Sequence, residues 1–421
     1  MDTTLEKLSR ISALRPRDRV SRPGATASPH SDKLIELLDG ERRTNGFGSH
    51  ILIRRSFPQN PPGKMSDRAL RLLAPDAAEE IADPALWLFL DTETTGLAGG
   101  TGTCAFLVGL GRWDGDGFVT EQHFMRDFSE ETPMLSDILE RLTPRSVLVT
   151  FNGKSFDWPL LQTRFAMRRL GAAPAPAAHL DFLYPARQLW RFCCGSVALT
   201  ELERRVLGLN RAGDIPSAAI PQIYFDFLRG GPAEPMAGVI RHNQMDLVGL
   251  AALAVHVLDL LADPETSRGC SEELFGVSRL LQRRGEERLA GRIYRRALEG
   301  GLPKAAERIA CRELALLAKR EGDFELSNEL WGKLLDDTAE GLKAYEQLAI
   351  YYEHRARSPE KAAALSREAL VRLQEAWRRG RVSPLQYRRW HASLQHRLNR
   401  LALKLAGPRS GAAAARAEDP V

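Results

Sequence analysis

The sequence has little cysteine and no long apolar run. Its five cysteines, with Cys193 and Cys194 adjacent, match neither a disulfide framework nor a C-x-x-C zinc motif. No stretch reaches the roughly 18 apolar residues of a membrane span, and the charged N-terminus lacks the apolar core of an export signal. These absences argue against a disulfide-rich secreted domain and predict a reduced, cytoplasmic protein with no membrane partner.

The net charge of +5 is unevenly distributed along the chain. Residues 85–262 carry 15 Lys and Arg against 19 Asp and Glu, whereas residues 372–400 carry 8 against 1. An acidic middle with basic flanks is compatible with metal-binding carboxylates in one part and attraction of phosphates in another. For any single charge run, a solvated helix face is the simpler explanation.

Composition and periodicity divide the 421 residues into five segments. Prolines and glycines interrupt every period in residues 1–45, which predicts a mostly flexible, basic arm. Residues 46–84 are predicted to be a strand and linker segment, and residues 85–262 an α/β domain in which buried strands alternate with helices. An all-helical segment at 271–400 and a disordered tail at 401–421 complete the chain.

The all-helical segment repeats itself. Leu314-Ala315 recurs 34 residues later as Leu348-Ala349, and Gly285 reappears within a similar pattern as Gly322. This period resembles that of tetratricopeptide repeats, although the full consensus is absent, and an unrelated helical bundle is the alternative. The basic end of the segment, which includes Arg388-Arg389 beside Trp390, is predicted either to bind phosphates or to cap the repeats as an amphipathic helix.

One strand organises the α/β domain. The five apolar residues Leu86–Leu90 predict a strand buried on both faces, and Asp91 and Glu93 follow it two residues apart, so they share a face. Adjacent buried carboxylates repel each other unless a cation lies between them. Oxygen ligands suit Mg²⁺ or Mn²⁺. Farther along, two strand-like runs joined across residues 114–117 predict a hairpin.

Three later residues extend this acidic pattern. Asp157 follows a buried strand and begins a helix, while His242 and Asp246 lie one turn apart on a long predicted helix, residues 235–261. Two metal ions about 4 Å apart, held by four carboxylates, stabilise the attacking and leaving oxygens of phosphodiester hydrolysis. His242 is then suited to take the proton of the attacking water.

These residues form three motifs: D-T-E at 91–93, N-G-K-S-F-D at 152–157 and H-N-Q-M-D at 242–246. Together they resemble the exonuclease motifs of the DEDD group of ribonuclease H-like nucleases. The likeness is greatest to the YprB-like family, whose members often carry tetratricopeptide repeats. It covers residues 85–262 and extends to His179-Leu180-Asp181 and Asp214-Ile215-Pro216.

The resemblance implies a ribonuclease H-like mixed sheet with flanking helices, followed by an all-α helical-repeat domain. It also implies 3′–5′ exonuclease activity on single-stranded DNA or RNA with two Mg²⁺ or Mn²⁺ ions. The implied metal ligands are four carboxylates and the implied base is a histidine: Asp91, Glu93, Asp157 and Asp246, with His242. Three residues separate His242 from Asp246, which is the spacing of tyrosine-type members and leaves the base less firmly assigned than the ligands.

The motifs also supply candidate substrate contacts: Thr94, Asn152, Lys154 and Phe156. Lys154 is able to reach a phosphate as a point charge, and Phe156 and Trp158 are expected either to stack on a base or to pack beneath the helix. Asp181 is predicted to have a structural role near the site. For Asp214 we expect loop capping.

Two other functions fit the same sequence. The first is a non-catalytic module that binds nucleic acid while the repeats recruit a protein partner. The presence of every acidic motif residue and of His242 argues against such a decayed site. The second is an endonuclease, which the motifs do not distinguish from an exonuclease.

Overall fold

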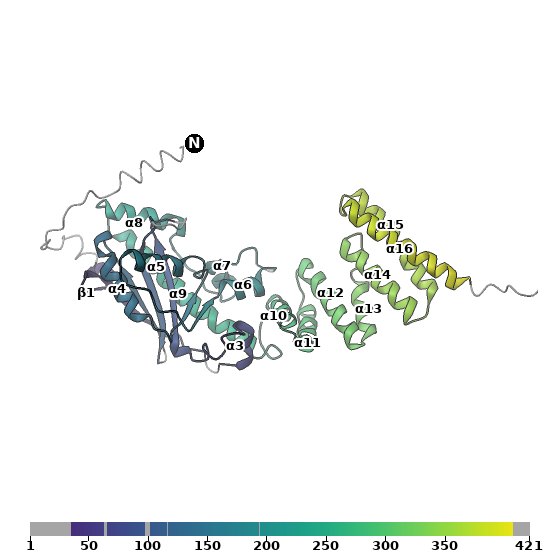
Figure 1. Ribbon diagram of the computed structural model, residues 1–421, viewed down its shortest axis with the longest axis horizontal. Helices are drawn as coiled ribbons and strands as arrows, with labels where there is room; N and C mark the ends of the chain where they lie inside the picture. The colour runs from purple at the N-terminus through teal and green to yellow at the C-terminus, as the bar shows by residue number, and fades with distance from the viewer. Residues whose placement is uncertain (1–34, 63–64, 97–101, 116, 193, 407–421) are drawn as a thin grey trace, which may run out of the picture.

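The computed structural model describes residues 35–62, 65–96, 102–115, 117–192 and 194–406. These residues form a seven-stranded sheet followed by an array of helices (Figure 1). The strands, in their order across the sheet, are β1 (Glu41–Asn45), β2 (Gly48–Phe57), β5 (Gly117–Phe124), β4 (Ala105–Asp114), β3 (Trp87–Thr94), β6 (Val147–Thr150) and β7 (Ala178–Asp181).

The sheet is mixed, as predicted. In the sheet order β1-β2-β5-β4-β3, each strand pairs antiparallel with the next. The β4–β5 pairing confirms the predicted hairpin. The parallel pairs β3–β6 and β6–β7 complete the sheet. Because β3, β6 and β7 are parallel, their carboxyl ends lie along one edge, which is where α/β sheets place their ligands.

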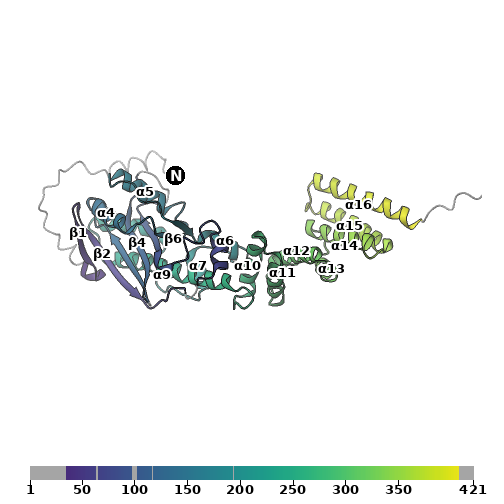
Figure 2. The same ribbon diagram turned by 60° about the horizontal axis from the view of Figure 1, so that its bottom comes forward.

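Helices cover both faces of the sheet (Figure 2). Trp87 and Phe89 of β3 pack in one hydrophobic cluster with the second half of α9, whereas Leu88 and Leu90 pack in another with α4 and α5. This confirms the strand predicted to be buried on both faces. The helices are α3 (Asp67–Leu73), α4 (Glu131–Arg141), α5 (Asp157–Met167), α6 (Leu183–Trp190), α7 (Leu199–Arg205), α8 (Ile220–Leu228) and α9 (Glu234–Ala262), with short 3₁₀ turns at Pro84–Leu86, Phe128–Glu130 and Ser217–Ala219.

Helix α9 is long and apolar enough, by length and composition alone, to cross a membrane. The sequence prediction overlooked this because Asp and His residues interrupt the apolar run. In the fold, however, α9 packs against β3, β4 and β5, and more than half of its most apolar window is buried. It is therefore the core helix of the α/β domain.

The second part of the chain is entirely helical where the structure describes it, as predicted. Its helices are α10 (Ser271–Arg283), α11 (Glu287–Glu299), α12 (Lys304–Glu321), α13 (Phe324–Gly332), α14 (Ala339–His354), α15 (Pro359–Arg378) and α16 (Pro384–Leu405), each packed against the next. Gly285 follows α10 with φ 82°, and Gly322 follows α12 with φ 86°. Their recurrence in the sequence thus has a physical reason, since glycine ends a helix in this left-handed conformation most easily. Membership of the tetratricopeptide family stays a prediction.

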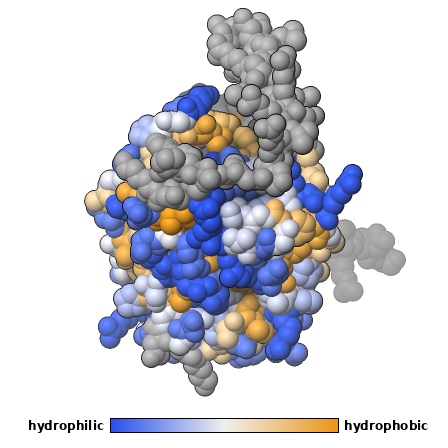
Figure 3. All heavy atoms as spheres, turned by 90° about the vertical axis from the view of Figure 1, so that its left-hand side faces the viewer, coloured by the Kyte–Doolittle hydropathy of each residue, from blue (hydrophilic) through white to orange (hydrophobic). Residues whose placement is uncertain are grey.

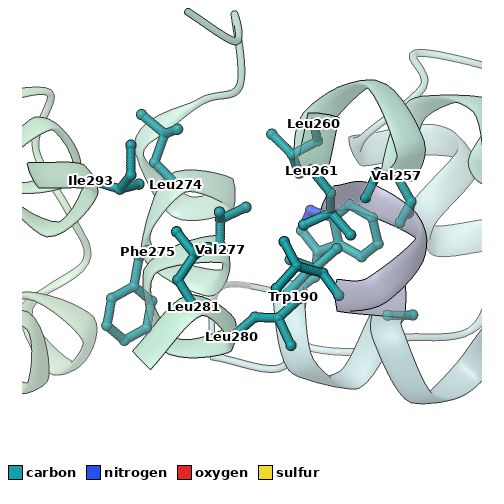
Figure 4. Packing of buried hydrophobic residues seen from close by; sticks show 14 of the residues in the cluster. Trp190, Val257, Leu260, Leu261, Leu274, Phe275, Val277, Leu280, Leu281 and Ile293 are labelled. Atoms are coloured by element: carbon teal, nitrogen blue, oxygen red, sulfur yellow. The ribbon is translucent and has the colours of Figure 1, made fainter. Parts of the chain in front are cut away.

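The two parts of the chain share one hydrophobic core. Leu280 of α10 lies beside Trp190 of α6, and Val257 and Leu261 of α9 belong to the same cluster (Figure 4). The same cluster of buried residues continues through α11 to α14. The predicted division between residues 85–262 and 271–400 therefore separates two segments of the sequence that pack into one core.

Two predicted boundaries are wrong. Strand β1 lies inside the predicted arm at 1–45, and α16 extends to Leu405, inside the predicted tail at 401–421. β1 is a solvent-exposed edge strand, so its polar sequence lacks the alternation that marks a half-buried strand. Figure 3 shows the end of the molecule that holds the sheet, and hydrophilic residues cover the middle of that face. Residues 1–34 and 407–421 lie outside the described residues.

Several arginines of the basic end hold the last helices together. Arg379 and Arg381 pair with Asp337, and a second set converges on the buried carboxylate of Glu353: Arg397, Arg400 and Lys404. For these residues the contacts favour the capping-helix interpretation over phosphate binding.

Candidate active site

The four carboxylates predicted as metal ligands converge where β3 ends. Asp91 and Glu93 lie on β3, Asp157 is the first residue of α5, and Asp246 lies on α9. Burial raises the pKa of Asp91 well above its usual range, and repulsion from the other three carboxylates adds to the shift. Burial also raises the pKa of Glu93, and repulsion from Asp246, Asp157 and Asp214 adds to that shift. The four groups form one cluster, in which Asp157 is buried and the other three are half-buried, and a divalent cation would stabilise it.

A strained loop between β6 and α5 positions the second motif. Asn152 adopts φ 68°, a conformation that non-glycine residues rarely take, and a Cβ at Gly153 would lie 2.5 Å from Thr150 Cβ. The carboxylate of Asp181 accepts the backbone N–H of Asn152 at 2.7 Å and that of Lys154 at 3.1 Å. Asp181 thus has the structural role expected for it, because it holds the loop that leads into α5.

Asp157 is also linked directly to β3. Thr92, which lies between the two acidic residues of β3, donates from Oγ1 to Asp157 Oδ1 at 2.5 Å. Burial raises the pKa of Asp157 from its ordinary 3.8 to about 6, although this hydrogen bond lowers it. Because side chains alternate along β3, Thr92 points to Asp157 while Asp91 and Glu93 share the other face of the strand.

Asn243 connects α9 to β3. Its Nδ2 donates to Asp91 Oδ2 at 2.7 Å, and its Oδ1 accepts from Gln122 Nε2 at 2.8 Å. The same Gln122 nitrogen donates to the Ile240 carbonyl at 2.8 Å. These buried bonds fix the rotation of α9, and with it the direction of Asp246.

His242 lies at the cluster, as the sequence predicts. Its Nε2 is 3.5 Å from Asp246 Oδ2, and its Nδ1 is 2.9 Å from Asp214 Oδ1. One ligand atom from each of Glu93, His242 and Asp246 lies within 4.8 Å of the other two. This geometry allows His242 either to act as a base beside the carboxylates or to be a metal ligand itself.

The donor set suits hard divalent cations. Arg211 Nη1 lies 2.6 Å from Asp246 Oδ1, and burial raises the pKa of Asp246 even though Arg211 and His242 lower it. A single guanidinium does not neutralise four converging carboxylates. Oxygen donors with one imidazole fit Mg²⁺ or Mn²⁺, so the residues present match the predicted ions.

The predicted substrate contacts surround the same edge of the sheet. Thr94 is buried and donates from Oγ1 to the Gly96 carbonyl at 2.9 Å, so its hydroxyl already has a partner in the loop. Lys154 is exposed, and its Nζ lies 5.8 Å from the ring centroid of Tyr184. Their contact with substrate stays a prediction, as it does for two neighbours in the loop: Asn152, which is exposed, and Phe156, which is half-buried. The adjacent Trp158 packs in the hydrophobic core, which favours the packing interpretation for that ring.

Sequence reasoning missed three residues of the site: Asn243, Gln122 and Arg211. Asn243 lies within the third motif, so a signal for it existed. Gln122 is on a strand with no acidic motif, and Arg211 is in the segment between α7 and α8. Neither carried a signal, because their contacts join residues far apart in the sequence.

A second buried group with ligand-type atoms lies between α4 and the sheet. His50 Nε2 is 3.0 Å from His123 Nδ1 and 3.6 Å from Asp137 Oδ2, to which Arg43 also donates at 3.1 Å. The other ring nitrogen of each histidine is buried without a hydrogen-bond partner. Histidines that bind a metal usually donate this second N–H to an acceptor. We therefore assign no metal to this group.

Comparisons with known proteins agree with the geometry. The model of the RNase_H superfamily matches residues 88–258, a range that contains all three motifs. The chain is 30% identical over 285 residues to the uncharacterized protein YprB of Bacillus subtilis (strain 168). This alignment covers 67% of this chain and 68% of YprB. These matches confirm the predicted ribonuclease H-like fold.

Proposed function

This chain belongs to the ribonuclease H superfamily and to the family of YprB, and from that premise we propose that it is a metal-dependent 3′–5′ exonuclease of the DEDD type. The observation that carries the proposal is the convergence of four carboxylates beside a buried histidine. The superfamily and these acidic residues support a nuclease. The 3′ polarity and the preference for single strands follow from the motif resemblance.

The chemistry divides between the ions and the side chains. We propose that two Mg²⁺ or Mn²⁺ ions are held by four ligands: Asp91, Glu93, Asp157 and Asp246. When bound, the ions stabilise the charge on the attacking and leaving oxygens. His242 accepts the proton of the attacking water at Nε2. Lys154 and Asn152, on the loop before α5, bind the phosphate backbone of the substrate.

The substrate class we propose is single-stranded DNA or RNA. We also propose that the helical array binds a protein partner. We place the protein in the cytoplasm. In support, the cysteines that the structure describes are all free: Cys104, Cys194, Cys270 and Cys311.

The test uses the full chain with Mn²⁺ or Mg²⁺ and single-stranded DNA and RNA. A 5′-labelled strand should give a ladder that shortens from its 3′ end, and a 3′-labelled strand should release labelled mononucleotide at once. A circular single strand should resist, because it has no end. Cutting of the circle would identify an endonuclease, and binding without hydrolysis of any substrate would identify a non-catalytic adaptor.

A further inference from the structure

Asp214 faces the outer nitrogen of the proposed base. Its Oδ1 lies 2.9 Å from His242 Nδ1 and also accepts the backbone N–H of Ile215 at 2.9 Å. The loop capping expected for Asp214 is thus present, but the carboxylate has a second partner. The His242 side chain is 5% exposed and that of Asp214 is 19% exposed, so little water competes for this contact.

The contact determines which nitrogen of His242 carries the proton. A carboxylate only accepts hydrogen bonds, and the contact of Nδ1 with Asp214 (2.9 Å) is shorter than that of Nε2 with Asp246 (3.5 Å), so in the neutral ring the proton lies on Nδ1 and the lone pair on Nε2. Nε2 lies 3.5 Å from Asp246 Oδ2 and 3.3 Å from Ser217 Oγ, whose hydroxyl is able to donate to it. The lone pair therefore faces the carboxylate cluster. Both roles open to His242, base and metal ligand, need this tautomer.

Two further residues hold Asp214 in place. Arg211 Nη1 lies 3.3 Å from Asp214 Oδ2 and 2.6 Å from Asp246 Oδ1, so one guanidinium joins both carboxylates. Arg211 also donates from Nε and Nη2 to the two oxygens of Glu203, each at 2.5 Å. The side chains of Arg211 and Glu203 are 7% and 1% exposed.

Helix α9 is shaped to receive this ion pair. A Cβ at Gly249 would lie 1.6 Å from Glu203 Oε1, so any larger residue at this position would displace the carboxylate of Glu203 from its place against the helix. Gly249 lies one turn beyond Asp246, on the same helix as His242. The ion pair and the proposed catalytic residues are thus built on one rigid element.

We propose that Asp214 is the positioning residue of His242, held by the buried pair Arg211–Glu203, and that this arrangement directs the Nε2 lone pair toward the metal ligands. The proposal deepens the proposed function and rests on it for its catalytic consequence. Asp214 does not touch the reacting atoms. It acts by fixing the ring orientation and the tautomer of His242.

A double-mutant cycle measures this role. We compare kcat for the wild type, Asp214→Asn, His242→Gln and the double variant of the full chain. His242→Gln is expected to lower kcat by about 10²- to 10⁴-fold, and Asp214→Asn by about 10- to 100-fold, as for other partners of functional histidines. In the His242→Gln background, Asp214→Asn should change kcat by less than about twofold. Equal losses in both backgrounds would make Asp214 a merely structural residue and overturn the proposal. Asp226→Asn, which removes an exposed carboxylate paired with Arg229, is the matched control.

A second measurement does not depend on activity. In the metal-free full chain labelled with ¹⁵N-histidine, the nitrogen shifts of His242 at pH 8 should identify the Nδ1–H tautomer. Asp214→Asn should shift the ring toward the Nε2–H form. An Nε2–H tautomer in the wild type would overturn the proposal even if the chain is an active nuclease. A wild type that hydrolyses nothing, with the Nδ1–H tautomer intact, would overturn the proposed function instead.

Discussion

A Cβ at Gly109 would lie 2.3 Å from Asn243 Oδ1, so β4 and α9 approach each other as closely as a glycine permits. The same Cβ would lie 2.8 Å from Leu247 Cδ1. This approach lets Asn243 reach Asp91 at 2.7 Å and places Asp246 one turn later beside the other carboxylates. The position of α9 on the sheet thus determines whether the third motif meets the first.

Gly109→Ala should therefore disturb the metal site through the helix. The added methyl group pushes α9 away from β4, and we expect a loss of about 1–3 kcal/mol in the free energy of unfolding, typical of overpacking. Mn²⁺ binding, measured by calorimetry, should weaken because Asn243 and Asp246 move with the helix. Urea unfolding gives the stability change.

Gly111→Ala is the matched control on the same strand. Its Cβ would lie 2.5 Å from Phe118 Cζ, so it overpacks the aromatic core instead of the contact with Asn243. It should destabilise the fold comparably and leave Mn²⁺ affinity unchanged. Equal weakening of Mn²⁺ binding by both variants would show that general loosening, and not the position of α9, governs the site.

Asp91→Asn should abolish hydrolysis and Mn²⁺ binding while the fold remains intact. The raised pKa of Asp91 means that its ionisation opposes folding, and the amide does not ionise, so the metal-free variant should be more stable than the metal-free wild type at pH 7. Thermal unfolding in a chelator checks the stability, and calorimetry checks the metal. Turnover at the wild-type rate would contradict the assignment of Asp91 as a ligand.

The stability of the metal-free protein should depend on Asp157. Its folded pKa of about 6 lies above the ordinary 3.8. The contribution of the protonated Asp157 to the free energy of unfolding is complete below pH 3.8 and is lost as the pH rises through about 6. A shift of this size corresponds to about 3 kcal/mol. Asp157→Asn keeps a neutral side chain, so its advantage over the wild type in chelator should be absent near pH 3.8 and increase up to pH 7.

The prediction concerns the difference in unfolding free energy between Asp157→Asn and the wild type, because other buried groups titrate in the same pH range. Burial lowers the pKa of His50 to about 4 and that of His123 well below its usual value. These histidines make both proteins less stable as the pH falls from about 6.5. A variant curve parallel to that of the wild type from pH 4 to 7 would show that the pKa of Asp157 is not raised. Saturating Mg²⁺ should reverse the order of stability at pH 7.

A chain truncated after Cys270 should lose cooperative folding, whereas one truncated after Gly301 should keep it. The shorter chain lacks α10, which covers Trp190 and neighbouring residues of α6 and α9 (Figure 4). A Cβ at Gly276 would lie 2.2 Å from the Leu189 carbonyl oxygen, so α10 lies directly against α6. Thermal unfolding and dye binding to exposed apolar surface separate the two chains. A cooperative melt of the shorter chain would restore the boundary predicted from the sequence.

Local patterns explain what could be predicted about the fold. The apolar run before Asp91 is continuous, so it identified a strand buried on both faces. Helical spacing in α4 to α9 and the hairpin between β4 and β5 depend on residues close together in the chain. The edge strand β1 escaped prediction because solvent covers its side chains and no alternation remains in its sequence.

The sequence by itself determined which residues are able to bind metal, because their types and spacing within three short motifs are local properties. Only the tertiary structure decided which of them meet and what holds them. Arg211 is one arginine among many in the sequence, and only the chain path places it between Asp246 and Asp214. The same holds for α10, because the sequence predicted a helix there but not that it packs against α6. The physical reason is that a side chain's energy depends on its burial and its neighbours, and those come from segments far apart in the sequence.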